Sequence, residues 1–475
     1  MDTNEEEDPL IASVLTKKEV GVARRGRYVP LEIISVLHFI PMMAMMPIQQ
    51  FYVIDNIARK YGQHTSADAE INYCPNSTAS FNNTEDRVQK ESANVLMYLG
   101  FFSTFLSVIP ILLMGAIADV FGRKPTLILA MFGMLLKEVV LIVTVYKGLT
   151  LWVLVLGEFF FGITGNFGAA LAALIGMVAD VTKPGKPRAF RITVLEGSVA
   201  ITLALSTVGI GFWIKDGNYR HPLIFCIACT ILSILLTIFT LPETSKSCKR
   251  ADRPARFREM LGACCRLYKN ESGKRRKLLV IGQVIFCINV ASVTGKTNVQ
   301  TLFLLHTPLC WTELHVQIFT CIQILVNWGS IILGIRILHR CMHDYGIIVI
   351  ALVSAVAGSV TFAFGQKDWI VYLYVLVCTM GNATSPLIRS LLSRLVSADE
   401  QGSLFASIGS MELLSTSLAQ LLYGEVYQLT LTFMPGLVFL VMAGLLFVAF
   451  CLSLLVYSWM AKEPVSQTET VVDVS

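Results

Sequence analysis

The stretch GAIADVFGRK, residues 115–124, decides the fold because it lies between two long apolar runs at 93–117 and 126–146. An α-helix needs about 20 mostly apolar residues to cross about 30 Å of hydrocarbon, and each flanking run is long enough for this. The stretch itself carries two glycines, one acidic residue and two basic residues. It therefore predicts a tight polar turn that joins two membrane-spanning helices.

The composition of the whole chain agrees with a membrane location. Of its 475 residues, 54% are hydrophobic and 15% are charged, whereas a soluble domain carries about 25% charged residues. These values exclude a single soluble domain, and they also exclude a disordered chain, which needs low hydrophobicity and high charge. No zinc-type Cys/His spacing, Gly-rich phosphate loop or nucleophile elbow occurs in the sequence. We therefore expect no enzyme, no metal, no cofactor and no nucleic-acid partner.

Apolar runs of similar length recur along the chain and predict twelve spans. The first six lie near 31–54, 93–117, 126–146, 149–178, 190–214 and 222–241. The last six lie near 278–305, 313–338, 345–365, 369–392, 402–423 and 434–460. The predicted fold class is therefore an all-α membrane protein with twelve transmembrane helices. Several runs contain Gly or Pro, which are tolerated where neighbouring helices or a cavity satisfy the freed backbone groups.

The spans fall into two groups of six, separated by a strongly basic polar interval. We predict an N-terminal bundle at 31–242, a basic linker at 243–277 and a C-terminal bundle at 278–460, with tails at 1–30 and 461–475. Most Lys and Arg residues fall in the tails, in the linker and in loops on the same side, so the positive-inside rule places both termini in the cytosol. The linker is expected either to lie on anionic lipid or to act as a topology determinant alone.

Two features of the opposite side fit this orientation. The sequons at Asn76 and Asn82 both fall in the first outer loop, where they are either glycosylated or bare surface residues. Cys74 and Cys310 fall in two different outer loops. An oxidising compartment allows these two cysteines to form a disulfide bond, and two free thiols are the alternative.

The stretch 115–124 matches the pattern G-x-x-x-D-x-x-G-R-K/R, which is typical of the major facilitator superfamily. Further blocks of sequence resemble one family within it, the proton-coupled folate transporter family (solute carrier family 46). These blocks are TPLCW at 307–311, ADV at 179–181, FRITVLE at 190–196, IRSLLS at 388–393 and EQGSLF at 400–405. The resemblance covers nearly the whole chain.

The resemblance implies a fold of two halves that rock about a central site, with a gate formed by Gly115, Asp119, Gly122 and Arg123. The glycines would let two helices approach closely, and Asp119 and Arg123 would make charge-assisted contacts. In the family, the equivalents of Cys74 and Cys310 are disulfide-bonded.

Ionisable groups at bilayer depth are costly and therefore suggest function. Glu196 lies one to two turns into the fifth span, where burial would favour its neutral form. In the folate carrier the matching Glu couples protons, and the alternative is a structural carboxylate. Arg389 matches a family Arg that serves proton coupling and substrate binding. Lys296 lies in a Gly-Lys-Thr-Asn run that interrupts a helix. Together Arg389 and Lys296 predict a site for an anion, unless each neutralises a carboxylate such as Glu412.

Three further polar groups within the spans complete the predicted site. Lys137 and Glu158 lie at similar depth on consecutive antiparallel spans, and we expect them to form an ion pair, more structural than catalytic. Asn166 replaces an Asp of the folate carrier and cannot titrate, and it is expected to bind substrate. Val293 replaces a His of that carrier, so the resemblance does not secure folate as the substrate.

The N-terminal tail carries a sorting motif that ends in Leu10 and Ile11, after Glu6 and Glu7. Its acidic dileucine spacing is read by clathrin adaptors, so the protein is expected in the plasma membrane or in endosomes and lysosomes. The resulting hypothesis is a symporter that moves an organic anion with protons into the cytosol, with a folate-like substrate as first choice. An endolysosomal exporter of steroid conjugates, bile acids or small peptidoglycan or nucleotide anions is the alternative, and a non-transporting membrane sensor is a third possibility.

Overall fold

The computed structural model describes residues 30–62, 79–182, 186–214, 217–244, 262, 273–338, 340–396 and 401–461. Within these residues all regular structure is helical. The N-terminal half contains α2(Pro30–Lys60), α3(Ala79–Phe105), α4(Val108–Phe121), α5(Arg123–Lys147), η1(Leu151–Val153), α6(Leu154–Ile163), α7(Asn166–Val181), α8(Lys186–Ile214) and α9(Arg220–Thr240). The C-terminal half contains α11(Gly273–Thr294), α12(Thr297–Leu305), α13(Glu313–Leu338), α14(Asp344–Ala363), α15(Asp368–Val377), η3(Gly381–Ala383), α16(Thr384–Arg394), α17(Gln401–Thr430) and α18(Leu437–Ala461).

Every predicted span corresponds to a helix or to a pair of consecutive helices. Eleven of these segments are long and apolar enough to cross a membrane. The predicted eleventh span is the long helix α17, which is not among these eleven because Ser, Thr, Gln and Glu residues interrupt its apolar sequence. The second, fourth, seventh and tenth spans are each broken into two helices. Backbone breaks at membrane depth are tolerated where they are buried in protein or line a cavity.

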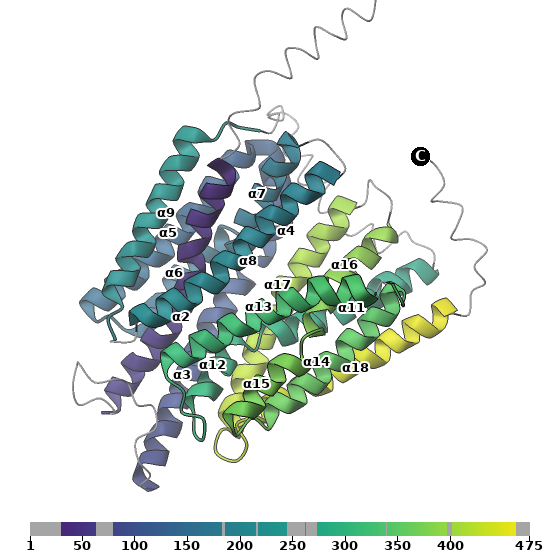
Figure 1. Cartoon of the computed structure of the whole chain (residues 1–475). Helices are drawn as coiled ribbons and strands as arrows, with labels where there is room; N and C mark the ends of the chain where they lie inside the picture. The colour runs from purple at the N-terminus through teal and green to yellow at the C-terminus, as the bar shows by residue number, and fades with distance from the viewer. Residues whose placement is uncertain are drawn as a thin grey trace, which may run out of the picture.

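The two halves lie beside each other and converge toward one end of the molecule, where α3, α12 and α15 lie (Figure 1). We call this the Cys310 end, and we call the opposite end, where α9 finishes and α11 begins, the linker end. α3 and α4 pack against α17, and α8 packs against α13, so these helices form most of the contact between the halves.

Hydrogen bonds also join the halves from mid-depth to the Cys310 end. The amide of Gln50 in α2 donates to Asn298 in α12. Tyr427 in α17 donates to Gln89 in α3 at 3.4 Å. The halves are therefore closed against each other at the Cys310 end.

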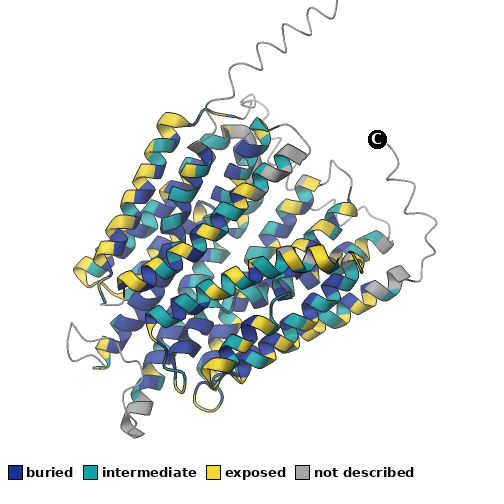
Figure 2. Cartoon of the chain, in the orientation of Figure 1, coloured by how far each residue is buried: buried dark blue, intermediate teal, exposed yellow. Residues whose placement is uncertain are grey.

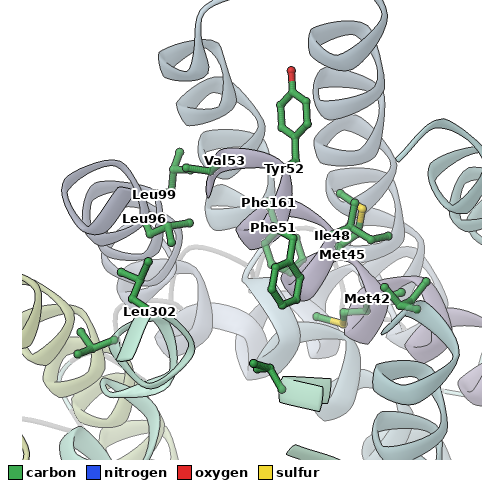
Figure 3. Packing of buried hydrophobic residues seen from close by; sticks show 14 of the residues in the cluster. Met42, Met45, Ile48, Phe51, Tyr52, Val53, Leu96, Leu99, Phe161 and Leu302 are labelled. Carbon is green, nitrogen blue, oxygen red and sulfur yellow. The ribbon is translucent and has the colours of Figure 1, made fainter. Parts of the chain in front are cut away.

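The largest buried cluster is centred on α2 and reaches across to the C-terminal half. Figure 3 shows Met45, Ile48 and Phe51 of α2 near Phe161 of α6, with Leu302 of α12 on the other side. Ile48, Phe51 and Leu302 are each 0% exposed. Exposed residues lie on the outer faces of the helices (Figure 2), where large apolar side chains such as Phe239 at 81% exposure fit contact with lipid.

Candidate functional site

A cavity of about 540 Å³ lies between the two halves near mid-depth. It is lined by residues from both halves, and this volume falls in the range of small-molecule sites, about 300–1,000 Å³. Its apolar wall comes largely from methionines of α2, among them Met42 and Met45, and from Phe161 and Phe167. Among the described residues, the charged side chains that line it are Lys137, Glu158 and Lys296.

Lys296 lies at the break between α11 and α12, as the Gly-Lys-Thr-Asn run predicts. Its ammonium group donates to the hydroxyl of Tyr374 and lies 4.9 Å from the centre of that ring. No carboxylate of the described residues lies within ion-pair distance of this ammonium group. Gly295 permits the break, because a Cβ there would collide with Ala419 and with the backbone of Ala291. Lys296 is thus an uncompensated cation in the cavity wall.

Lys137 and Glu158 form the predicted ion pair, with 2.7 Å between the ammonium nitrogen and the carboxylate. Gln49 of α2 donates a second hydrogen bond to Glu158 at 2.8 Å, so the carboxylate joins three helices. Glu138, the neighbour of Lys137, lies on another face of α5 and accepts a hydrogen bond from Thr230 at 2.8 Å. Both residues of the pair line the cavity. The sequence predicted the pair and a structural role for it, but not its place in the cavity wall.

Asn166 also lines the cavity, and it begins α7 directly after the break in the fourth span. Its φ of 54° and that of Gly165, 90°, are left-handed, a conformation that Gly and Asn adopt more readily than other residues. The Asn166 amide donates to the hydroxyl of Ser103 at 3.2 Å. The structure thus brings Asn166 and Lys296 to the same cavity.

Glu196 is exposed, so the expectation that it is buried was wrong. It precedes Leu203 and Thr207 by seven and eleven residues, or about two and three turns, and therefore shares their face of α8. Leu203 and Thr207 line the cavity and Glu196 does not. The physical reason for its exposure is its place nearer the linker end, beyond the part of α8 that lines the cavity.

Arg389 lies outside the cavity lining, so the structure does not bring it together with Lys296. It forms an ion pair with Glu412 of α17, and its guanidinium lies 5.1 Å from the centre of the Phe286 ring. This is the alternative in which Arg389 neutralises a carboxylate. The two side chains remain 41% and 32% exposed, so the pair is not enclosed by the protein.

The motif at 115–124 forms a charged junction at the linker end. Arg123 pairs with Asp180 of α7 at 3.4 Å. Glu243, which follows α9, accepts hydrogen bonds from the backbone N–H groups of Arg123 at 2.9 Å and Lys124 at 3.1 Å. A carboxylate at a helix N-terminus is favourable because those N–H groups have no partner within the helix. Gly122 has a φ of 104°, which ends α4 and starts α5.

Some predicted residues fall outside what the structure describes. Gly115 and Asp119 lie in α4, but their side-chain surroundings are not among the described features, so the predicted contact of Asp119 with Arg123 stays a prediction. Leu10, Ile11, Cys74 and Asn76 also lie outside the described residues, as does most of the linker.

Two predictions for the outer side can be compared with the structure. Cys310 is disulfide-bonded, while Cys74, its predicted partner, is not described. Asn82 lies near the start of α3, which begins at Ala79, and it precedes the candidate membrane span that begins at Thr84. The helix starts earlier because polar residues extend it beyond the apolar run on which the prediction was based.

Sequence reasoning missed the amides of the cavity. Gln50 accepts a hydrogen bond from Thr301 at 3.3 Å, and Gln300 donates to Gln323 at 3.0 Å. All four residues line the cavity. The signal was present as Gln49 and Gln50 within an apolar run, but the search followed charged groups alone.

Comparisons with known proteins agree with this architecture. The model of the Major Facilitator Superfamily matches residues 71–420. The proton-coupled folate transporter of Rattus norvegicus is 29% identical over 423 residues, covering 88% of this chain and 90% of the relative. The lysosomal proton-coupled steroid conjugate and bile acid symporter SLC46A3 of Homo sapiens is 25% identical over 406 residues, covering 84% and 88%. These similarities confirm the predicted resemblance.

Solved structures show the same fold at lower identity. The human organic anion transporter MFSD10 has a TM-score of 0.59 at 15% identity, covering 90% of this chain and 99% of that structure. The inward-open xylose transporter XylE from E. coli has a TM-score of 0.61 at 13% identity, covering 92% and 97%.

Proposed function

The chain belongs to the Major Facilitator Superfamily, and on this premise we propose that it is a proton-coupled symporter of an organic anion, directed into the cytosol. The proposal needs a site that attracts an anion and a group that exchanges a proton. The names of two relatives support the proposal. One is a proton-coupled folate transporter, and the other is a lysosomal proton-coupled steroid conjugate and bile acid symporter.

The observation that carries the proposal is the uncompensated charge of Lys296. An ammonium group without a carboxylate partner is costly at membrane depth, and an anionic substrate would compensate it. Its hydrogen bond to Tyr374 fixes its position in the cavity wall. The surrounding methionine and phenylalanine side chains suit the apolar body of an organic anion, and the amides suit its polar groups.

For proton coupling we propose Glu196 and Arg389, on the resemblance to the folate carrier. The Glu196 side chain is exposed and that of Arg389 is partly exposed, so neither is sealed within the protein. A folate-like anion remains the first choice of substrate. The alternative is export of steroid conjugates or bile acids from lysosomes, which the name of the lysosomal relative supports. Both termini are proposed to be cytosolic, with Leu10 and Ile11 read by adaptors.

Uptake of radiolabelled folate and oestrone sulfate tests this function at pH 5.5 and 7.4, with Leu10 and Ile11 changed to Ala to favour surface display. The control for the site is Lys147→Met, which removes an exposed ammonium group at the end of α5. Lys296→Met should lower uptake about tenfold to a hundredfold, because a hydrogen bond to a charged group contributes about 1.5–3 kcal/mol. Normal uptake by Lys296→Met at normal surface level, or no acid-stimulated uptake of either anion by the wild type, would overturn the proposal.

A further inference from the structure

The ion pair of Lys137 and Glu158 is built into the wall of the cavity. The Glu158 side chain is 2% exposed and that of Lys137 is 13% exposed, yet both residues line the cavity. Glu158 is held by two donors, because the Lys137 ammonium group lies 2.7 Å from one carboxylate oxygen and 2.9 Å from the other, and Gln49 donates to the first of these oxygens at 2.8 Å. A ligand anion that reaches this wall competes with Glu158 for the same ammonium group.

The charged groups around this pair are few. Lys296, in the C-terminal half, is the other charged residue among those described in the cavity lining. Glu138 lies beside Lys137 in sequence, but its carboxyl group is 0% exposed and bonds to Thr230 of α9. Phe161 of α6 places its ring 5.0 Å from the Lys137 ammonium group. Glu158 is thus the carboxylate that compensates Lys137 on the cavity side.

The net charge of the cavity wall therefore depends on Glu158. When Glu158 is ionised, the three charged groups sum to one positive charge, which suits one anionic group of a substrate. When Glu158 takes up a proton from water, the sum becomes two positive charges, one on each half of the molecule. Burying an uncompensated second negative charge in a site of low dielectric is unfavourable. A dianion is therefore favoured only after Glu158 is protonated.

We propose that Lys137 and Glu158 form a proton-switched anion subsite, which admits the second negative group of a dianionic substrate when Glu158 is neutral. The proton enters from the aqueous phase, the O–H bond forms on Glu158, and Lys137 is released to the substrate. Dissociation of the dianion lets Lys137 pair again with Glu158, and the proton returns to water. This inference rests on the proposed anion symport, but it adds a second proton site besides Glu196 and a substrate class.

The switch is tested by ligand binding to the purified protein in detergent. The two ligands are folate, which has two carboxylates, and oestrone sulfate, which has a single anionic group. The dissociation constants of both are measured at pH 5.5 and 7.4 for the wild type, Glu158→Gln and the control Glu425→Gln, an exposed carboxylate of α17. The wild type should bind folate more weakly at pH 7.4, by up to about tenfold for each pH unit through one proton. Oestrone sulfate binding should change far less between the two pH values.

Glu158→Gln keeps an acceptor for Gln49 and leaves Lys137 free at every pH. It should bind folate at pH 7.4 as tightly as at pH 5.5, while Glu425→Gln keeps the wild-type pH dependence. If Glu158→Gln does not fold, Lys137→Gln with Glu158→Gln removes both charges, and should bind folate weakly at both pH values and oestrone sulfate normally.

The possible failures are distinguishable. A wild-type pH dependence of folate binding in Glu158→Gln, or pH-dependent folate binding in the double variant, would show that the pair is structural while anion symport stands. If the wild-type protein binds neither anion at either pH, both the subsite and the proposed function are wrong.

Discussion

The carboxylate of Glu85 lies 3.8 Å from the imidazole of His306, and this contact joins α3 of the N-terminal half to the segment after α12 in the C-terminal half. Asp86 lies 3.5 Å from the same imidazole. The backbone N–H of Thr307 donates to Glu85 at 3.2 Å. His306 is 6% exposed, so these contacts are largely shielded from solvent. They hold the Cys310 end closed.

His306→Ala should therefore shift the protein toward a conformation open at the Cys310 end. Losing the imidazole leaves the buried carboxylate of Glu85 with fewer partners, at a cost of about 1–3 kcal/mol. A cysteine introduced in place of cavity-lining Ile324 should react faster with an impermeant maleimide applied at that end. His343→Ala, at the exposed residue before α14, is the control. Equal labelling rates in the two variants would contradict the role of His306.

Gly122→Ala should destabilise the protein by more than about 2 kcal/mol. Its φ of 104° and ψ of 160° lie in a region that is nearly restricted to Gly. An added Cβ would also collide with the carboxylate of Glu243. Gly148→Ala is the matched control, since Gly148 also has a positive φ, 60°, but has open space around it. The measurement is thermal unfolding of the purified variants, and equal losses would show that the Glu243 junction contributes nothing.

Variants of Arg389 and Glu412 distinguish a structural role of Arg389 from a role in substrate binding. If the arginine also contacts substrate, Arg389→Ala should lower uptake even when Glu412 is already Ala. If it serves Glu412 alone, the double variant should transport as well as Glu412→Ala. The direct energy of a partly exposed pair is small, about 0–1 kcal/mol, so a large loss of uptake cannot come from the pair itself. Surface expression is measured for each variant alongside uptake.

Glu196→Gln should remove most of the pH dependence of oestrone sulfate uptake, because a proton carrier that cannot titrate no longer responds to the acidic side. The side chain is exposed, so the substitution should leave stability within about 0.5 kcal/mol of the wild type. Uptake of oestrone sulfate between pH 5.5 and 7.4 gives a readout that should depend little on Glu158. An unchanged profile in Glu196→Gln at normal surface level would remove this residue from the coupling mechanism.

Cys310→Ser should destabilise the protein by about 2–4 kcal/mol, as loss of a disulfide bond does. If Cys74 is its partner, Cys74→Ser should have the same effect, and the double variant should be no worse than either single one. Cys341→Ser, at an exposed free cysteine, is the control. Additive losses of melting temperature in the double variant would mean that the two cysteines are not paired with each other.

The sequence by itself determined the number and the place of the spans. Runs of about 20 apolar residues can cross the bilayer only as helices, because hydrocarbon offers no partner for the backbone groups. It also determined the Lys137–Glu158 pair, since two opposite charges at equal depth on consecutive antiparallel spans are strongly attracted in that environment. The break at Lys296 was equally visible, from the glycine and the polar run around it.

The tertiary structure alone decided which of the charged groups share the cavity. Glu196 and Lys296 both lie within apolar runs, but only the packing of the helices determines where the cavity begins and ends, and Glu196 lies beyond its end on the same face of α8 as Leu203 and Thr207. Likewise, the place of Arg389 beside Glu412 depends on how α16 packs against α17. These relationships join residues that are distant in sequence, and no local pattern specifies them. The cavity that unites Lys296, Lys137 and Glu158 exists only because the two halves meet at the Cys310 end.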